Sequence, residues 1–320
     1  MVHMRFSLSS EASGSRSRSK LSLSVKKKQK PKQKPKSPSK KNRSKVLLKT
    51  DLLPPHTGMR YIIPLDMHKG AKISRVNKYD PITDLRALLS DSQLSVLKNS
   101  CFGYLMDLPN FKVQNQLIHN LFVRKLKQPN EDEIWVGISG KILNFGIKEF
   151  ATVTGLLCLG NYDKMRYSKV ENGFVEAYYS GTYPVFKSSI KNSILGKEWK
   201  NDIDAIKMAK MYLLHHFLLT STTDSHISKG DLDILDSDKF DYFPWGKDIF
   251  KMTLESLKYG ASTTLKDYYY RLNGFPYAFQ LWFYECCPYL NGKYYDNKDV
   301  QIPHLLNWSN DSLGKFEDYY

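Results

Sequence analysis

The chain has 320 residues and a formal net charge of +16, and 16 of its 48 Lys and Arg residues lie in the first fifty residues beside one acid, Glu11. The other 270 residues hold 32 bases and 31 acids, so the pI near 9.4 describes a tail and gives no reason to expect a basic nucleic-acid-binding face on the body. No apolar run reaches the ~20 residues of a membrane span, and residues 1–10 lack the apolar core of a signal peptide.

The sequence divides into a tail and a body. Residues 13–45 alternate Ser, Lys, Arg, Gln and Pro with three apolar residues, so they cannot bury a core, whereas the body holds all five Trp residues. We expect a disordered basic tail over 1–60, a transition over 61–94, a helical domain over 95–310 and a short end over 311–320. The fold class predicted is mainly α, with one small β-hairpin in a single multi-helix domain.

The tail carries two basic clusters separated by a Pro-spaced linker, the pattern of a bipartite nuclear-localisation signal. The clusters are Lys26, Lys27, Lys28 and Lys40, Lys41, Arg43. We therefore expect import-receptor binding and a nuclear location, together with weak, non-specific nucleic-acid binding by the tail. An organelle transit peptide, which would direct the chain to a plastid, stays an alternative because residues 5–24 are rich in Ser and contain several Arg residues.

Helical periodicity begins at Ser90, which with Gln93 predicts a capping box. A second helix is expected after Pro109, forming an αα-hairpin with the first. The alternation in residues 134–145 around Ser139-Gly140 predicts a two-residue β-hairpin, followed by a short helix that Gly155 ends. Residues 156–200 should form loops with one or two short helices.

The longest helix is expected to start near Asp202, and its apolar residues, from Ile203 to Leu218, cover most of its circumference. This pattern predicts a central, buried helix. Three further helices are expected: from Pro244 to Gly260, from Leu265 to Leu272, and from Pro276 to a stop at Pro288. The residues predicted to be in the core are Phe150, Phe217, Trp245 and Trp282.

The residue types that carry chemistry fall in unfavourable contexts. Adjacent His215 and His216 point about 100° apart on a helix and cannot ligate one metal from one face, so we expect a core-edge His and an exposed one. Cys286 and Cys287 lie at a helix C-terminus, where the helix dipole raises a thiol pKa. Glu285, among aromatic residues, is expected to be exposed or paired.

Two further motifs give no functional signal. Residues 137–141 lack the spacing of a phosphate-binding loop. Tyr268–Tyr270 would need basic neighbours to stack on bases, so we expect these tyrosines to pack against the core or a partner. No cofactor and no metal are predicted.

Four stretches resemble the plant domain of unknown function nineteen eighty-five: residues 135–156, 216–219, 243–246 and 274–285. The motif residues, which we interpret as structural, are Phe145, Gly146, Phe150, Thr154, Gly155, Pro244, Trp245, Gly246, Gly274, Phe275, Pro276, Trp282 and Glu285. The resemblance spans about residues 95–310. It implies a plant nuclear gene of the kind derived from Mutator-like transposons, in which this domain precedes a SUMO-protease-like cysteine peptidase.

That peptidase needs a His, an Asp, a Gln and a nucleophilic Cys in an Asp-Cys-Gly context, and none of these contexts occurs here. We therefore expect no enzymatic activity. The leading hypothesis is a nuclear protein-interaction module with an unidentified protein partner. The alternatives are the non-catalytic part of a SUMO-protease-like enzyme, which includes a truncated gene product, and a transposon-related DNA-associated protein.

Overall fold

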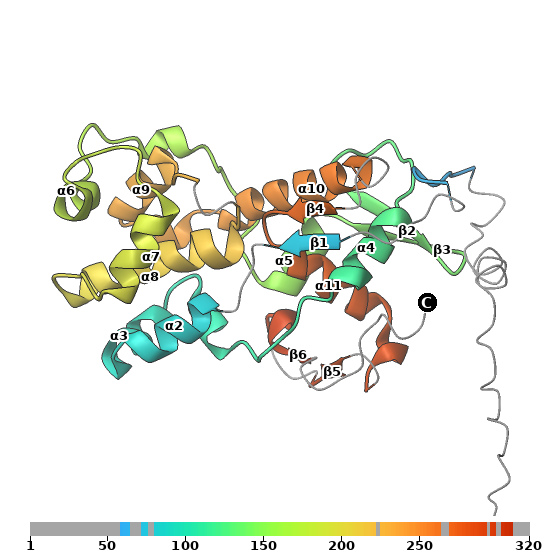
Figure 1. Cartoon of the computed structure of the whole chain (residues 1–320), viewed down its shortest axis with the longest axis horizontal. Helices are drawn as coiled ribbons and strands as arrows, with labels where there is room; N and C mark the ends of the chain where they lie inside the picture. The colour runs from blue at the N-terminus through green and yellow to red at the C-terminus, as the bar shows by residue number, and fades with distance from the viewer. Residues whose placement is uncertain are drawn as a thin grey trace, which may run out of the picture. The chain divides into compact units, whose positions relative to one another are not determined.

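The structure is a computed structural model, and it describes residues 58–64, 72–75, 80–221, 225–263, 269–292, 295–298 and 302–309. The α-helices are α2 (Asp80–Leu88), α3 (Asp91–Lys98), α4 (Asn115–Val123), α5 (Ile147–Thr154), α6 (Gly173–Tyr179), α7 (Lys187–Leu195), α8 (Asp202–Leu213), α9 (Lys229–Asp236), α10 (Trp245–Thr263) and α11 (Pro276–Cys286). The strands are β1 (Lys72–Arg75), β2 (Ile134–Ile138), β3 (Lys141–Phe145), β4 (Tyr269–Leu272), β5 (Asp296–Asn297) and β6 (Trp308–Ser309). The mainly α fold is thus confirmed (Figure 1).

Residues 1–57 of the predicted tail lie outside the described residues, and both of its basic clusters are among them. All described residues fall in the larger of two units, residues 41–320. In Figure 1, α2, α3 and α6–α9 gather at one end of this unit, and α4, α5, α11 and β1–β4 gather at the other. The long helix α10 reaches from one group to the other.

Helix α3 begins where the sequence indicated. The Ser90 side chain accepts a hydrogen bond from the Gln93 amide, and the Gln93 side chain accepts one from the Ser90 amide, which completes the capping box. The sequence analysis missed the preceding helix, α2. Only Ile82 and Leu85 among its residues are apolar and fully buried, so its apolar face is short. Arg86 on α2 donates to the Met106 carbonyl oxygen at 2.7 Å, which joins α2 to the turn after α3.

The predicted αα-hairpin is wrong. Helix α3 packs on α8, whereas α4 packs on α10 and α11. The reason is the segment between α3 and α4, which contains a 3-10 helix, Gly103–Asp107, and an extended stretch. A tight hairpin needs a short connection, and this one carries the chain to the other group of elements.

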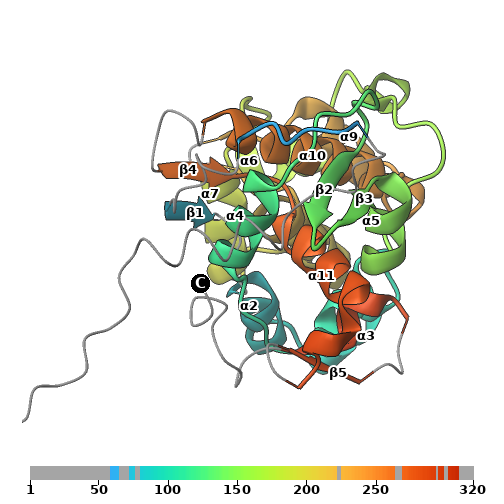
Figure 2. The ribbon, with the colours of Figure 1, turned by 90° about the vertical axis from the view of Figure 1, so that its right-hand side faces the viewer.

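The β2–β3 hairpin and α5 are confirmed. Ile138 pairs with Lys141, and Ser139 and Gly140 both have positive φ, as a two-residue type I′ turn requires. Helix α5 ends at Gly155, which is in the left-handed conformation with φ 71°. Figure 2 shows this hairpin beside α5 and α11.

Helix α8 is central, as predicted, and continues into a π-helical turn, Leu214–Leu218. Seven of its twelve residues are buried, and α2, α3 and α7 pack against it. Ile203 is the exception to the prediction, because its side chain is 71% exposed. It shares the uncovered strip of α8 with Lys207 and Lys210, which follow at the i+4 and i+7 positions.

The region 222–245 contains a helix that the sequence analysis did not predict. Helix α9 is capped by Ser228, whose side chain accepts from the Asp231 amide. Helix α10 starts at Trp245 and runs past Gly260 to Thr263, so the predicted stop at Gly260 is wrong. A glycine costs a helix only about 1 kcal/mol relative to alanine, which the rest of a 19-residue helix can offset.

The predicted helix over Leu265–Leu272 is wrong. Residues 269–272 form strand β4, which pairs in parallel with β1 in the register Lys72 with Tyr269. Tyrosine is a strong strand former, and the partner strand lies about two hundred residues upstream, so no local pattern reveals it. With β5–β6, the described residues contain three two-stranded pairings instead of one hairpin.

Helix α11 is confirmed, with Pro276 in its first turn and Pro288 beyond its end. The four aromatic residues predicted to be in the core are all buried: Phe150, Phe217, Trp245 and Trp282 are 0, 0, 1 and 3% exposed. Phe145 is the centre of an aromatic cluster, with its ring 5.1 Å from that of Phe279 and 5.3 Å from that of Trp282. Edge and tilted contacts of this kind add to the area that each ring buries.

Gly155 provides a test of how α5 meets the C-terminal segment. A Cβ at Gly155 would lie 2.4 Å from Cβ of Pro303, and the φ of 71° disfavours any side chain. We expect Gly155→Ala to lower the free energy of unfolding by about 2–4 kcal/mol, from left-handed strain and overpacking. Urea unfolding followed by circular dichroism measures this loss.

Gly292→Ala is the matched control for Gly155→Ala. Its φ is 75°, but no described atom lies within 4 Å of the added Cβ. We expect a cost of only about 1–2 kcal/mol from the backbone conformation. Equal losses in the two variants would show that Pro303 does not pack on α5.

Candidate functional site

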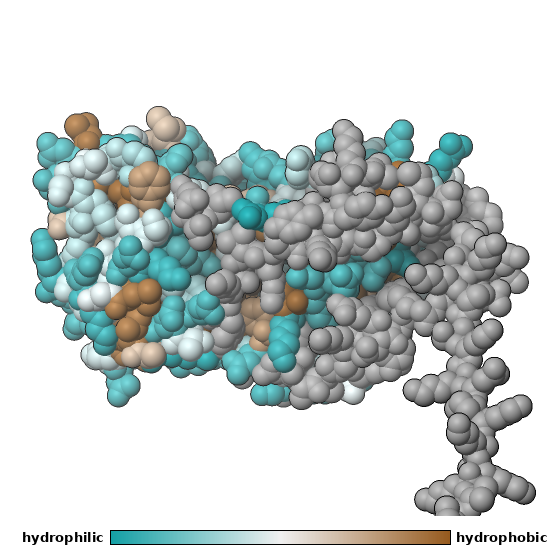
Figure 3. All heavy atoms as spheres, viewed as in Figure 1, coloured by the Kyte–Doolittle hydropathy of each residue, from teal (hydrophilic) through white to brown (hydrophobic). Residues whose placement is uncertain are grey.

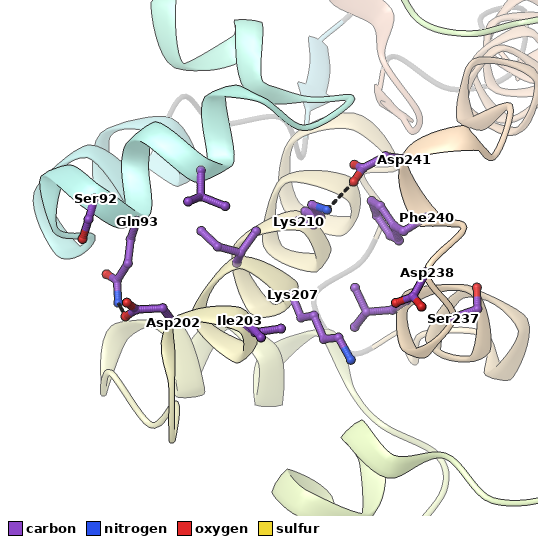
Figure 4. Close-up of a pocket in the computed structure, with 13 residues that line it drawn as sticks. Ser92, Gln93, Asp202, Ile203, Lys207, Lys210, Ser237, Asp238, Phe240 and Asp241 are labelled. Carbon is purple, nitrogen blue, oxygen red and sulfur yellow. Dashed lines mark hydrogen bonds and ion pairs between the residues drawn. The ribbon is translucent and has the colours of Figure 1, made fainter.

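The candidate site is a groove between α3, α8 and residues 237–241, which we call the α3–α8 groove. Its volume is about 370 Å³, within the range of pockets that bury ligands. Figure 4 shows α3 on one side, α8 along the base and residues 237–241 on the other side. The lining residues are Ser92, Gln93, Val96, Asp202, Ile203, Ile206, Lys207, Lys210, Leu235, Ser237, Asp238, Phe240 and Asp241.

Hydrogen bonds hold the three walls of the groove together. Gln93 on α3 donates to Asp202 at the start of α8, with 2.8 Å between Nε2 and Oδ1. Asp241 accepts from the backbone amide of Cys101, just after α3, at 3.1 Å and from Lys210 on α8 at 2.6 Å. The groove is therefore formed before any partner arrives, which lowers the entropy lost on binding.

The groove has an apolar base and apolar edges. Ile206, Leu235 and Phe240 are 7, 2 and 3% exposed and form the base, while Val96 and Ile203 are 56 and 71% exposed at its edges. Single exposed apolar residues are normal on a protein surface, but here two of them border one hollow. Figure 3 shows hydrophobic atoms among hydrophilic ones on the face where α3 lies beside α8.

The charges of the groove are partly neutralised. Lys210 pairs with Asp241 and lies 5.6 Å above the centre of the Phe240 ring, and Lys207 lies 3.4 Å from Asp236. Burial raises the pKa of the Asp241 carboxyl group, but the hydrogen bonds from Lys210 and the Cys101 amide outweigh burial and bring this pKa below its usual value. Asp202 and Asp238 are exposed, and no lysine or arginine of the described chain forms an ion pair with either.

A second polar cluster, the Asp231 network, lies beneath the surface. Lys164 forms ion pairs with Asp231, at 2.7 Å, and with Asp248, and the Asp231 carboxylate is also 3.3 Å from Nε2 of His215. Asp231 is 3% exposed and His215 is 5% exposed. Ser228 places Asp231 in the first turn of α9, and the π-helical turn after α8 presents His215 to it.

The pKa values show how this network is charged. Burial alone would raise the pKa of Asp231, but His215, 3.3 Å away, and the charge of Lys164 hold it at about 2. Burial lowers the pKa of His215, and Asp231 opposes this only in part, so His215 is neutral at neutral pH. The charge that compensates Asp231 is therefore that of Lys164, and the network is a structural ion pair in the interior.

Lys187 and His216 form a related pair of buried groups. Lys187 is 5% exposed and donates to the Leu219 carbonyl oxygen at 2.8 Å and to Ser221 at 2.6 Å, and burial lowers its pKa to about 8. Nε2 of His216 is 2.9 Å from the Lys187 carbonyl oxygen, and burial lowers its pKa to about 4. The expectation of one exposed His is wrong, because His215 is buried and His216 is half-buried.

Replacing Asp231 tests the network. We expect Asp231→Asn to lower the free energy of unfolding by about 2 kcal/mol, because it removes the buried carboxylate of the network and leaves the half-buried Lys164 with Asp248 as its ion-pair partner. The carboxylate stabilises the fold above pH about 4, the ordinary pKa range of Asp, and this stabilisation disappears as pH falls toward the folded-state pKa of about 2. Urea unfolding at neutral pH and at pH about 2 measures both effects.

Asp107→Asn is the control for this substitution. Asp107 pairs with Lys98 at 2.6 Å, but the two side chains are 54 and 48% exposed. An exposed pair contributes about 0–1 kcal/mol, so this variant should unfold nearly as the wild type does. Equal losses in the two Asp variants would contradict the role given to Asp231.

All four thiols are held protonated at neutral pH. Burial raises the pKa of Cys158 to about 11. Burial, and to a smaller extent the charge of the neighbouring Asp241, raises the pKa of Cys101. Cys286 is exposed, but desolvation by surrounding atoms and the nearby Cys287 and Glu285 raise its pKa to about 12. Burial also raises the pKa of Cys287. None of these settings produces the thiolate that a cysteine nucleophile requires.

No group of three or more His, Cys, Asp or Glu side chains in the described part of the chain could hold a metal ion. No helix among those residues has both the length and the apolar character to cross a membrane. The side chains of Tyr268–Tyr270 lie outside the described residues. Glu285 accepts from Nε1 of Trp308 at 3.0 Å and lies 3.1 Å from Nδ1 of His304, so it is paired as expected.

The motif glycines lie where backbones approach closely. An added Cβ at Gly246 would lie 2.5 Å from Sγ of Cys158, and one at Gly274 would lie 2.5 Å from Oγ1 of Thr253. The Gly274 amide also donates to the Thr220 carbonyl oxygen at 2.8 Å, which joins the end of the π-helical turn to the start of α11. Gly146 donates its amide to Glu149 and caps α5.

The remaining motif residues are in the core or at helix ends. Trp245 donates its indole N–H to the Phe240 carbonyl oxygen at 2.9 Å, and Thr154 donates to the Phe150 carbonyl oxygen at 2.7 Å. The buried aromatic members are Phe145, Phe150, Trp245, Phe275 and Trp282, and Pro244 and Pro276 precede or open helices. Thus the motif residues do not converge on one catalytic cleft, and none of them lines the α3–α8 groove.

Comparison with known proteins gives one finding. Residues 122–256 match the model of a family described as a domain of unknown function (DUF1985). The match covers three of the four stretches on which the family resemblance rests, those at 135–156, 216–219 and 243–246. The matched stretch runs from α4 to α10 and contains α8 and residues 237–241, while α3 and α11 lie outside it. A search of curated proteins and a search of solved structures each found no match to this chain.

The sequence analysis missed both the groove and the Asp231 network. Signals for α9 were present, namely Ser228 before Asp231 and apolar residues at 232, 234 and 235. The exposed position of Ile203 had no signal of its own, because an isoleucine on an apolar helix is normally buried. The stretch that matches the family model thus contributes two walls of the groove through residues outside the quoted motifs.

Proposed function

We propose that this chain is a non-enzymatic protein-interaction module of the nucleus, and that the α3–α8 groove is its binding face. The observation that carries the proposal is the pair of exposed apolar side chains, Val96 and Ile203, at the edges of a hollow of about 370 Å³ with an apolar base. When a partner protein binds, exposed apolar side chains of this kind become buried at the centre of the interface. Truncation of a side chain there costs the most binding affinity.

The raised thiol pKa values support the non-enzymatic part of the proposal, since a cysteine peptidase uses a thiolate. The buried ionisable groups also have structural partners: Asp231 has Lys164, and Lys187 has the Leu219 carbonyl oxygen. A relation to SUMO-protease-like proteins stays part of the proposal through the family resemblance alone. If this relation holds, the chain would bind a protein, and a separate peptidase domain would act on that protein.

The charge pattern favours a protein partner over nucleic acid for the body. Several lysines near the groove and the Asp231 network already pair with aspartates, among them Lys169 with Asp236 and Lys229 with Asp233. Paired lysines release few counterions when a nucleic acid binds. We therefore assign any nucleic-acid binding to the tail.

Substitution of Val96 tests the binding face. We expect Val96→Asp in the full chain to abolish capture of the partner from a nuclear extract, because it places a charge at the apolar edge of the groove. The control is Val170→Asp, which changes a 99% exposed valine that does not line the groove. Mass spectrometry identifies the captured protein. The purified partner must then bind the purified wild-type chain and fail to bind the Val96→Asp variant.

Because Val96 is 56% exposed, the melting temperature of the Val96 variant should stay within a few degrees of the wild-type value. Identical sets of captured proteins for the wild type and both variants would exclude the groove as the binding face.

The tail gives an independent test of location. We expect residues 1–50, fused to a fluorescent protein in plant cells, to accumulate in the nucleus, and we expect Lys26, Lys27 and Lys28 changed together to Ala to lose this accumulation. The control changes Lys32, Lys34 and Lys36 to Ala, which removes the same charge and leaves both clusters intact. Fluorescence in plastids would support the transit-peptide alternative instead.

A further inference from the structure

We propose that the partner of the α3–α8 groove is a protein segment in which an apolar anchor residue is flanked on both sides by Lys or Arg. This inference rests on the proposed function, because it specifies the chemistry of the partner at the same face. It depends on the apolar base and edges of the groove, on the two carboxylates that form no ion pair within the described chain, and on the hydrogen bonds that join its walls.

The apolar anchor follows from what the groove exposes to water. Val96 on α3 and Ile203 on α8 stand at the edges, above a base that includes Leu235 and Phe240. A bulky aliphatic or aromatic side chain that enters between them removes both edges from water and contacts the base. This gain grows with the apolar area covered, whereas a polar side chain would lose hydrogen bonds to water at the same place.

The flanking basic residues follow from the balance of charge. Lys210 pairs with Asp241 at 2.6 Å, and Lys207 lies 3.4 Å from Asp236, which also pairs with Lys169. Among the residues that line the groove, three aspartates therefore stand against two lysines. Asp202 accepts a hydrogen bond from the neutral Gln93 amide, and Asp238 forms no ion pair within the described chain. These two carboxylates leave the groove with an excess of negative charge.

The positions of the two carboxylates give the arrangement of the partner. Asp202 and Asp238 lie on opposite sides of the groove in Figure 4, with Ile203 between them. A segment that crosses the groove with its anchor at Ile203 would bring one flanking residue near each carboxylate. Lys239 follows Asp238 in the chain but is not among the residues that line the groove.

The rigid walls decide what kind of complex forms. The bonds of Gln93 to Asp202 and of Asp241 to Cys101 fix α3, α8 and residues 237–241 relative to one another. The partner segment therefore becomes ordered on a surface that changes little. Such complexes select the partner by shape at the anchor and by charge at the rim.

The experiment is selection of random twelve-residue peptides, displayed on phage, against the full wild-type chain. We expect the enriched peptides to share a large apolar residue with Lys or Arg on both sides. The strongest peptides are then synthesised, and their dissociation constants are measured by fluorescence anisotropy for the wild type and for full-chain variants. Each variant carries the same basic tail, so non-specific attraction or repulsion between the tail and a peptide is the same for all of them.

Three variants separate the anchor from the charges. Ile203→Asp should weaken every selected peptide by about tenfold or more, because the edge that covers the anchor becomes charged. Asp238→Lys should weaken the basic peptides about three- to tenfold and should weaken a version with Glu flanks less or not at all. Glu171→Lys is the control, since Glu171 is exposed, lies outside the groove and gives the same change in net charge.

The outcomes distinguish the two levels of the proposal. Peptides that lose affinity with Ile203→Asp but are neutral or acidic, or that bind equally to Asp238→Lys and Glu171→Lys, would overturn the basic partner and leave the groove as the binding face. Peptides that bind equally to all variants, or no enrichment above the background of the phage, would count against the groove itself. Melting temperatures of the variants confirm that each one is folded.

Discussion

The burial of α8 is the constraint on which the rest of this structure depends. Neighbouring helices pack on it from several sides, and its continuation as a π-helical turn contacts the start of α11 through Thr220 and Gly274. A helix covered in this way keeps one uncovered strip, which here carries Ile203, Lys207 and Lys210. This strip and the neighbouring Ile206 form the part of the α3–α8 groove that α8 contributes, so the position of the groove follows from the packing of the core.

The π-helical turn also explains where the buried charges lie. An extra residue in a helical turn changes the direction of the side chains that follow it. In this chain the turn presents His215 to Asp231 and His216 to the Lys187 carbonyl oxygen. Buried ion pairs contribute little net stability against an apolar replacement, but the loss of one partner is costly. The Asp231 network therefore fixes the positions of α9 and Lys164 relative to α8, and it contributes less to the free energy of folding.

The motif residues of the DUF1985 resemblance have a common physical role. Gly155, Gly246 and Gly274 each lie where another part of the chain comes within 3 Å of the place a Cβ would take. The aromatic motif residues fill the core beside these crossings, as Phe145 and Trp282 do. These residues hold the helices at fixed distances, and the groove is built from other residues that the same arrangement brings to the surface.

The sequence by itself determined the local elements. Ser90 with Gln93, the Ser139-Gly140 turn, Gly155 and Pro276 each act within a few residues, so capping, turn and proline rules predicted α3, the hairpin, α5 and α11. The aromatic core was predictable for the same reason, because apolar periodicity is local. The charge balance of the body likewise followed from composition.

The tertiary structure decided everything that depends on distant partners. Strand β4 forms because β1 pairs with it, and α4 leaves α3 because α10 and α11 cover it. Ile203 is exposed because α3 and residues 237–241 lie on opposite sides of the groove and leave this part of α8 uncovered between them. The periodicity of apolar residues along α8 is equally compatible with a buried isoleucine at position 203. Which apolar residues become a binding surface depends on what the neighbouring elements leave uncovered, and long-range packing sets this outcome.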